Sequence, residues 1–254
     1  MEPTTFTAVR DAIQSEIPVA IAKVIVGPSI GSDLVLIHPD RVQGTLGSPA
    51  ADEAALQLLH TMLRDGGSAL DEIDGRRVFL EGHLPPPHLV IIGAVHIAIP
   101  LVTFGHTLGF RTTVIDARGQ FATDARFPHA DQLIEAWPDE ALARLSLHPG
   151  VAAVCLAHDP KFEDPAMHAL LRSDVGYVGA IGSRATSAER RERLAAEGFT
   201  NEELNRIHGP VGLNIGAKTP EEIALAIMGE IIAVRDGRHL QIAGTVMSSA
   251  KSTA

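Results

Sequence analysis

The chain carries one stretch whose residue types and spacing suit the binding of a dinucleotide. An apolar run at 88–92 leads into a glycine turn at Gly93, and a second apolar run ends on Asp116, 23 residues after that glycine. In dinucleotide-binding βαβ units the glycine turn brings a pyrophosphate to a helix N-terminus, and an acid about 20 residues later bonds a ribose hydroxyl. We therefore predict a crevice of this type, with Asp116 as a solvated ribose ligand.

The glycine pattern of this crevice is incomplete. The three positions of G-x-G-x-x-G/A are Gly93, Val95 and Ala98. The middle glycine normally lets the backbone approach a pyrophosphate, so the branched side chain of Val95 is predicted to hinder that approach. An acid at position 116 would also repel a 2′-phosphate, which favours a non-phosphorylated dinucleotide. The residues of this segment assigned to cofactor binding are Gly93, Ala94, Val95, His96, Asp116 and Arg118.

Two histidines and an aspartate are the candidates for acid–base chemistry. Ligands of doubly wound sheets bind at the carboxyl ends of strands, where the strand order reverses. With the order 3-2-1-4-5, the turn that carries His96 faces His158 and Asp159, which follow the fourth strand. Histidine suits proton transfer at neutral pH. Each residue could instead enter a helix or form a local turn, and the spacing matches no specific metal pattern, so no metal site is predicted.

A second glycine-containing turn, at 177–184, precedes a helix and could bind an anion. Gly182 and Ser183 can expose backbone N–H groups at the helix N-terminus, and Arg184 adds a guanidinium for a phosphate or a carboxylate. The alternative is a simple glycine turn with a solvated arginine. Three further arginines are assigned to the exposed face of the helix that follows: Arg190, Arg191 and Arg193.

Composition limits the function classes. The chain has 254 residues, a net charge of −10, 45% hydrophobic residues and 20% charged residues. This acidic balance argues against general binding of nucleic acid, and no apolar stretch reaches the length of a membrane span. No secretion signal is recognised at the N-terminus, so a cytoplasmic protein is predicted. The single cysteine, Cys155, lies in an apolar run and is predicted to be buried.

The first part of the chain is predicted to be a small α+β domain over 1–84. It would contain helices at 6–17 and 51–63, a strand at 18–26, and a hairpin with strands at 33–37 and 41–46. Three prolines at 85–87 form a stiff connector, which we take as the domain boundary. A Ser-, Ala- and Thr-rich tail is expected at the C-terminus, within a segment 238–254.

The part at 88–237 is predicted to be a Rossmann-like domain, a doubly wound parallel sheet covered by helices on both faces. The expected strands are 88–92, 111–116, 131–135, 151–157 and 176–181. The expected helices are 96–108, 139–147, 164–172, 184–197 and 219–235. The last of these helices begins at the capping box Thr219–Glu222, and the loop at 210–218 before it is predicted to contact a ligand or a partner.

Several of these segments together resemble the xanthine dehydrogenase accessory factor family, the XdhC/CoxI-like proteins. The matching segments are 93–96, 114–118, 126–128, 158–159, 177–184, 206–207 and 210–224. The resemblance covers roughly 88–235, and the block at 210–224 is its most specific part. It implies a cytoplasmic chaperone that binds molybdenum cofactor, assists its terminal sulfuration and delivers it to a molybdenum hydroxylase. The implied partners are this client enzyme and a sulfur-donor protein; we also expect a homo-oligomer.

The sequence departs from this family in its N-terminal part. The segment 42–50 resembles a glycine-rich family segment that ends in Gly-Gly-Cys, but Ser48 and Pro49 replace the glycines and Ala50 stands where the cysteine is expected. A thiolate at this place is therefore absent. Two alternatives stay open: an NAD-dependent oxidoreductase that uses His96 or His158 as its acid or base, and a regulatory protein without a working pocket.

Overall fold

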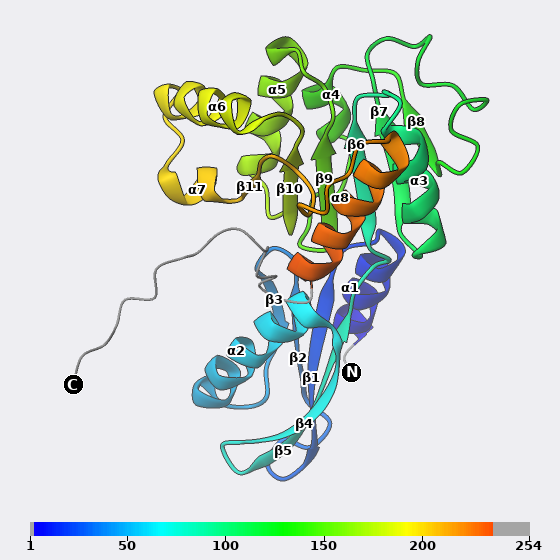
Figure 1. Cartoon of the computed structure of the whole chain (residues 1–254). Helices are drawn as coiled ribbons and strands as arrows, with labels where there is room; N and C mark the ends of the chain where they lie inside the picture. The colour runs from blue at the N-terminus through cyan, green and yellow to red at the C-terminus, as the bar shows by residue number, and fades with distance from the viewer. Residues whose placement is uncertain (1–2, 236–254) are drawn as a thin grey trace. The chain divides into compact units, whose positions relative to one another are not determined.

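The structure, a computed structural model, describes residues 3–235 and consists of two compact units (Figure 1). Of the described residues, the N-terminal unit contains 3–87, 143–151 and 173–175, and the Rossmann unit contains 88–142, 152–172 and 176–235. The predicted tail at 238–254 lies outside the described residues. None of the helices within 3–235 combines the length and the apolar composition that a membrane crossing requires.

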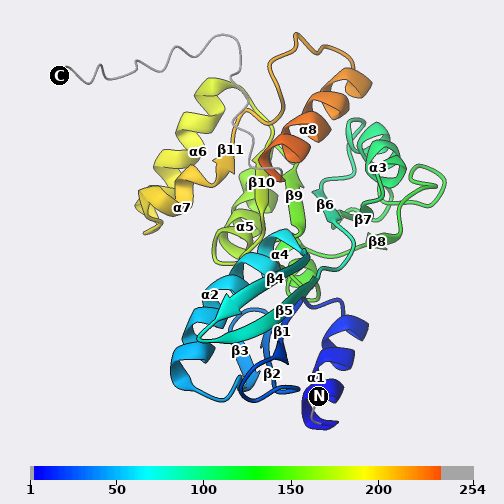
Figure 2. The same ribbon diagram turned by 90° about the horizontal axis from the view of Figure 1, so that it is seen from below.

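The N-terminal unit is an antiparallel sheet with one helix on each face (Figure 2). The strand order is β3-β2-β1-β5-β4. Apolar side chains of α2 pack on one face of the sheet and those of α1 on the other. The elements are α1 (Pro3–Gln14), β1 (Val19–Val26), β2 (Asp33–Ile37), β3 (Arg41–Gly44), α2 (Pro49–Asp65), β4 (Gly67–Ile73) and β5 (Arg76–His83).

The hairpin β4–β5 was not among the predicted elements. Its turn is Asp74-Gly75, and both residues have positive φ angles, 48° and 71°. Asp-Gly with two positive φ angles is a strong hairpin signal, so the sequence did contain the information. In the segment 42–50, Ser48 is the N-cap of α2: its hydroxyl accepts a hydrogen bond from the Ala51 N–H at 3.2 Å. Pro49 is the first residue of that helix.

The Rossmann unit contains a six-stranded sheet in the order β8-β7-β6-β9-β10-β11. Numbered within the unit, this order is 3-2-1-4-5-6, which confirms the predicted 3-2-1-4-5 arrangement and adds a sixth strand. The strands are β6 (His88–Ile92), β7 (Arg111–Ile115), β8 (Gln132–Ile134), β9 (Val151–Cys155), β10 (Tyr177–Ala180) and β11 (Ile207–His208). The pairs of β7 with β6 and β8, and of β10 with β9 and β11, are parallel.

Helices cover both faces of this sheet, as predicted. Figure 1 shows α3 and α8 together on one face, and α4, α5 and α6 on the opposite side. The helices are α3 (Ala98–Thr107), α4 (Pro138–Leu142), α5 (Pro160–Leu171), α6 (Arg184–Ala196), α7 (Asn201–Asn205) and α8 (Pro220–Arg235). The short elements α7 and β11 were not predicted. Cys155 is buried in β9, which confirms its prediction, and burial raises the pKa of its thiol to about 11.

Two predicted helices have different bounds in the structure. The helix expected at 139–147 begins at Pro138 and ends at Leu142, and the residues from Ala143 belong to the N-terminal unit. The helix expected at 164–172 begins earlier, at Pro160. It does so because the Asp159 carboxylate accepts a hydrogen bond from the Lys161 N–H at 3.0 Å and so caps the helix.

One buried histidine gives this fold a testable pH dependence. His88 is buried at the start of β6, and its Nε2 lies 2.8 Å from Thr113 Oγ1. Burial lowers the pKa of the imidazole from 6.5 to about 4, against an opposing effect of Asp131. As the pH falls below 6.5, His88 therefore becomes protonated in the unfolded state but stays neutral in the folded state until the pH approaches 4. We expect this residue to reduce the free energy of unfolding by about 2 kcal/mol between pH 7 and pH 5.

Denaturant unfolding of the wild type and of His88→Leu at both pH values measures this contribution. The variant differs from the wild type in stability at every pH. Its loss of unfolding free energy between pH 7 and pH 5, however, should be smaller than that of the wild type by about 2 kcal/mol. Equal losses in the two proteins would show that His88 takes up a proton in the folded state as readily as in the unfolded state.

Candidate functional site

The glycine turn after β6 closes against the end of β9. Gly93 has φ +107°, a conformation that side-chain-bearing residues rarely adopt. A Cβ at this position would lie 3.1 Å from the Ala157 backbone nitrogen and 3.3 Å from the Leu156 carbonyl carbon. The two segments, more than 60 residues apart in sequence, thus approach so closely that the turn requires glycine.

The Asp116 carboxylate links this turn to the end of β7. It is only 4% exposed and accepts a hydrogen bond from the Ala94 N–H at 2.8 Å. Arg118 donates to it three times: from its backbone N–H at 2.9 Å, from Nε at 2.9 Å and from Nη2 at 2.8 Å. The expectation of a solvated carboxylate was therefore wrong, because the chain folds its own donors onto both oxygens.

Charge is balanced within this small cluster. Burial alone would raise the pKa of Asp116, but hydrogen bonds from Arg118 and Ala94 outweigh it, so the pKa lies below its ordinary value. The pKa of Arg118 is raised, first by its hydrogen bonds to Asp116 and also by the nearby charge of Asp159. Asp116 and Asp159, which follow different strands, therefore act on the same guanidinium. A ribose hydroxyl could bond to the Asp116 carboxylate only if the Arg118 side chain moved away from it.

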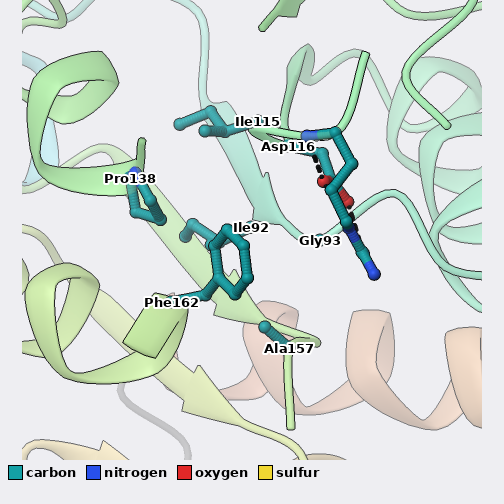
Figure 3. A pocket seen from close by; sticks show the side chains of 8 residues that line it. Ile92, Gly93, Ile115, Asp116, Pro138, Ala157 and Phe162 are labelled. Atoms are coloured by element: carbon teal, nitrogen blue, oxygen red, sulfur yellow. Dashed lines mark hydrogen bonds and ion pairs between the residues drawn. The ribbon is translucent and has the colours of Figure 1, made fainter. Parts of the chain in front are cut away.

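A pocket opens at this place (Figure 3). Figure 3 shows the Phe162 ring beside Ile92, with Pro138 across from them and the Asp116 carboxylate further along. The residues that line the pocket are Ile92, Gly93, Ile115, Asp116, Arg118, Pro138, Ala157 and Phe162. They come from the ends of three adjacent strands and from the starts of α4 and α5, so this is the crevice where a doubly wound sheet binds its ligands.

The start of α3 offers hydrogen-bond donors next to the glycine turn. Among the hydrogen bonds of residues 3–235, none is donated by the backbone N–H groups of Val95, His96 or Ile97. Such free donors at a helix N-terminus suit an anion. The Val95 side chain is half-buried and packs against the hydrophobic core of the unit. Val95 is not among the residues that line the pocket, and its effect on a bound pyrophosphate stays a prediction.

The family is decided by a match over most of this unit. A family model described as the XdhC Rossmann domain matches residues 89–231. The chain belongs to the XdhC Rossmann domain family. The resemblance seen in the sequence is thereby confirmed, as is the Rossmann-like fold.

Two relatives of this XdhC-family chain are informative. A probable xanthine dehydrogenase subunit of Bacillus subtilis (strain 168) is 34% identical over 158 residues, covering 62% of this chain and 46% of that protein. The molybdenum cofactor insertion chaperone PaoD of Escherichia coli (strain K12) is 27% identical over 139 residues, covering 52% of this chain and 43% of that protein. The matches thus span less than half the length of these two relatives.

A solved structure is similar over nearly the whole chain. It is the crystal structure of a protein described as a xanthine dehydrogenase from Bacillus halodurans, with a TM-score of 0.60 and 26% sequence identity. The match covers 92% of this chain and 67% of that one. The fold of this XdhC-family chain, including its N-terminal sheet, therefore has a known counterpart.

The predicted acid–base residues of the XdhC-family crevice follow β6 and β9 at the carboxyl edge of the sheet. His96 and His158 are exposed, and within residues 3–235 neither ring makes a hydrogen bond or an ion pair. The Asp159 carboxylate is used to cap α5. A catalytic histidine normally has a partner that fixes its orientation. None of the three residues lines the pocket described above, and their roles stay predictions.

The second predicted site, at the start of α6, is partly used by the fold itself. Gly182 has φ +144°, and the Ser183 hydroxyl caps α6 by accepting from the Thr186 N–H at 3.1 Å. Arg184 is exposed and stays a candidate anion ligand. The assignment of Arg190 to the exposed face was wrong: its side chain is 2% exposed.

Arg190 is buried because a carboxylate and a carbonyl inside the unit accept its hydrogen bonds. Its Nε donates to the buried Glu163 carboxylate, and its Nη2 donates to the Ile181 carbonyl at 2.7 Å. The next two arginines of this helix also have partners. Arg191 donates to the Leu204 carbonyl at 2.8 Å, and Arg193 pairs with Asp164 at 2.7 Å. Arg190, Arg191 and Arg193 thus attach α6 to its neighbours.

The loop at 210–218 is anchored by a buried carboxylate. Glu230 accepts hydrogen bonds from the Gly212 N–H at 2.8 Å and from the Tyr177 hydroxyl at 2.6 Å. The Nδ1 atom of His208 lies 3.6 Å from its Oε1 atom. Burial would raise the pKa of Glu230, but these hydrogen bonds lower it below its ordinary value. The capping box at Thr219–Glu222 is present, with the Glu222 carboxylate 3.0 Å from the Thr219 nitrogen. A ligand or partner role of the loop remains a proposal.

The sequence did not point to the aromatic residues around the crevice. Phe162 lines the pocket, the Trp137 ring stacks on it with 4.7 Å between the centroids, and Arg118 lies 4.6 Å from the centre of Phe121. None of them belongs to the glycine pattern. A signal was available in Trp137, the single tryptophan of the chain, because it directly precedes Pro138 at the start of a helix.

Asp116→Ala is expected to lower both stability and nucleotide binding. The Ala94 N–H and the Arg118 guanidinium lose their acceptor, and an unsatisfied buried donor costs about 1–3 kcal/mol in free energy of unfolding. Asp124→Ala is the matched control, because Asp124 is exposed in a nearby loop. Chemical unfolding of the two variants measures the difference in stability. Equal stability would mean that the hydrogen bonds that Asp116 accepts from Ala94 and Arg118 do not stabilise the crevice.

Proposed function

We propose that this chain is a maturation factor that binds molybdenum cofactor and assists its sulfuration or its insertion into a molybdenum hydroxylase. The observation that carries the proposal is the family match over 89–231, which includes every residue that lines the crevice. The names of two relatives, a molybdenum cofactor insertion chaperone and a xanthine dehydrogenase component, support a role in the maturation of such an enzyme.

The crevice suits the phosphate-bearing, organic part of such a cofactor. The backbone N–H groups of Val95 and His96 would receive a phosphate at the start of α3. Asp116 and Arg118 offer an acceptor and a donor for hydroxyl and phosphate groups. Within residues 3–235, no three His, Cys, Asp or Glu side chains come together as metal ligands. Recognition would therefore act on the pterin and its phosphate, and the cofactor would bring the molybdenum with its own sulfur ligands.

The exposed Arg184 and the turn at Gly182–Ser183 would add a positively charged margin to the same carboxyl edge of the sheet. His96, His158 and Asp159 would line the centre of the site. Their lack of a fixed acid–base arrangement supports binding and transfer of a cofactor over turnover of a substrate.

The chain's own cysteine is unsuited to carrying sulfur. Cys155 is the single cysteine of the sequence, it is buried, and the pKa of its thiol is raised to about 11. A sulfur carrier needs an accessible thiolate. We therefore propose that a separate sulfur-donor protein supplies the sulfur and that this chain presents the cofactor to it. A cytoplasmic location and a homo-oligomeric state belong to the same proposal.

Affinity capture from the native host, combined with hydride-transfer assays, tests this function. We expect the tagged chain to retain a molybdenum hydroxylase or a sulfur-donor protein, and the purified chain to show no saturable oxidation or reduction of NAD(H). NAD(H) turnover that His158→Ala abolishes would overturn the proposal and indicate an oxidoreductase. A captured client whose activity does not depend on the chain would contradict the maturation role.

A further inference from the structure

An exposed aromatic surface borders the crevice. Trp137 is 43% exposed, and its ring stacks on Phe162 with 4.7 Å between the centroids and an angle of 11° between the planes. Phe162 and Pro138, the neighbour of Trp137, both line the pocket that contains Asp116. The tryptophan therefore extends the aromatic wall of the crevice outward, beyond the buried part of the pocket.

One side of the Trp137 ring is held against Phe162, while 43% of the residue stays open to solvent. Large exposed aromatic rings beside a pocket are typical of sites that bind planar ligands, because a base can stack on the free face.

Arg118 adds a second planar surface to the same wall. Its guanidinium carbon lies 4.6 Å from the centre of the Phe121 ring and 5.7 Å from that of Phe162. The group is held in place by its paired hydrogen bonds to Asp116. Aromatic rings and a guanidinium plane that line one site favour a flat, electron-rich heterocycle.

We propose that the base of a nucleotide stacks on the exposed face of Trp137, with its ribose directed to the Arg118 guanidinium that Asp116 holds in place. This inference rests on the proposed function and narrows its ligand. The preferred form of the cofactor would carry a nucleotide, because the bare pterin monophosphate has no base for this surface. The remainder of the ligand would extend along the carboxyl edge of the sheet, past the glycine turn at Gly93.

Because the chain has one tryptophan, its fluorescence reports on this surface alone. The probes are AMP, CMP and ribose 5-phosphate, titrated at matched ionic strength and followed by both fluorescence and calorimetry. We expect AMP or CMP to quench Trp137 with the same midpoint as the heat signal, and to bind at least about tenfold more tightly than ribose 5-phosphate. Equal affinity for ribose 5-phosphate, or no binding of any probe, would overturn the inference.

Variants separate stacking from simple coverage of Phe162. Trp137→Leu, which keeps apolar bulk but no ring, should weaken binding of AMP about tenfold and leave ribose 5-phosphate unchanged. Trp137→Phe should retain most of the affinity. Leu225→Ala is the matched control, because Leu225 is an exposed apolar residue of α8 in the same unit. Undiminished binding of AMP by a folded Trp137→Leu protein would contradict the inference.

The outcomes distinguish this inference from the proposed function. Capture of a molybdenum hydroxylase together with unchanged binding by Trp137→Leu would leave the maturation role standing and remove the stacking site. Base-dependent quenching without any client or cofactor would do the reverse: the stacking site would stand, and the maturation role would fall.

Discussion

Arg190→Met is expected to lower the free energy of unfolding by about 3–5 kcal/mol, which is the usual cost of removing one partner from a buried ion pair. The variant removes the close cation of the Glu163 carboxylate, which is 3% exposed, and leaves it only the more distant Arg193 at 4.0 Å. The Ile181 carbonyl loses its Arg190 donor. Chemical denaturation followed by circular dichroism measures the loss.

Two further proteins control this experiment. Arg191→Met removes a half-buried arginine of the same helix that has no ion-pair partner among the described residues, and it should cost about 1 kcal/mol. The double variant Arg190→Met, Glu163→Leu removes both charges and should recover most of the stability. If Arg190→Met were no worse than Arg191→Met, the buried pair would not attach α6 to α5.

Gly93→Ala is expected to disrupt the crevice. The substitution adds backbone strain of about 1–3 kcal/mol at a positive φ angle. Its Cβ also meets the Ala157 nitrogen at 3.1 Å and forces the ends of β6 and β9 apart, which adds about 1–3 kcal/mol of overpacking. Because the same shift moves the α3 N-terminus, we expect the variant to bind AMP at least about tenfold more weakly.

Comparison with Gly109→Ala separates the overpacking between β6 and β9 from the backbone strain. Gly109 also has a positive φ, +78°, but a Cβ there would meet nothing within 4 Å. Both variants carry the strain, so their difference in unfolding free energy reports the close approach at the crevice. Equal stabilities, or normal AMP binding by Gly93→Ala, would show that the two strand ends can separate without harm to the site.

The sequence predicted the Rossmann sheet well because its signals are local and repeated. Each of the predicted strands contains an apolar run, and the glycine at 93 with the acid at 116 fixes the first βαβ unit and the place of the crevice. The two-residue strand β11 has no such run and was missed. The capping box at 219–222 likewise located the start of α8. The missed hairpin at β4–β5 had its own local signal in Asp74-Gly75, so that omission was avoidable.

The errors at the site concern side chains whose partners lie far away or are not specified by a pattern. Asp116 looked solvated because nothing in the motif says that Arg118 folds back onto it. Arg190 looked exposed because charge on a helix usually faces water, and its partner Glu163 lies on another helix. The stacking of Trp137 on Phe162 depends on tertiary packing, so the sequence offered only the single tryptophan before Pro138 as a signal.

The proposed binding of molybdenum cofactor is tested most directly by mass spectrometry of the small molecule that co-purifies with the protein from its native host. Molybdenum is measured in the same sample. We predict a pterin that carries molybdenum in the wild type and Gly109→Ala, and its loss in Gly93→Ala. NAD in place of a pterin, or a wild-type protein that retains no small molecule while its client matures normally without it, would contradict the account.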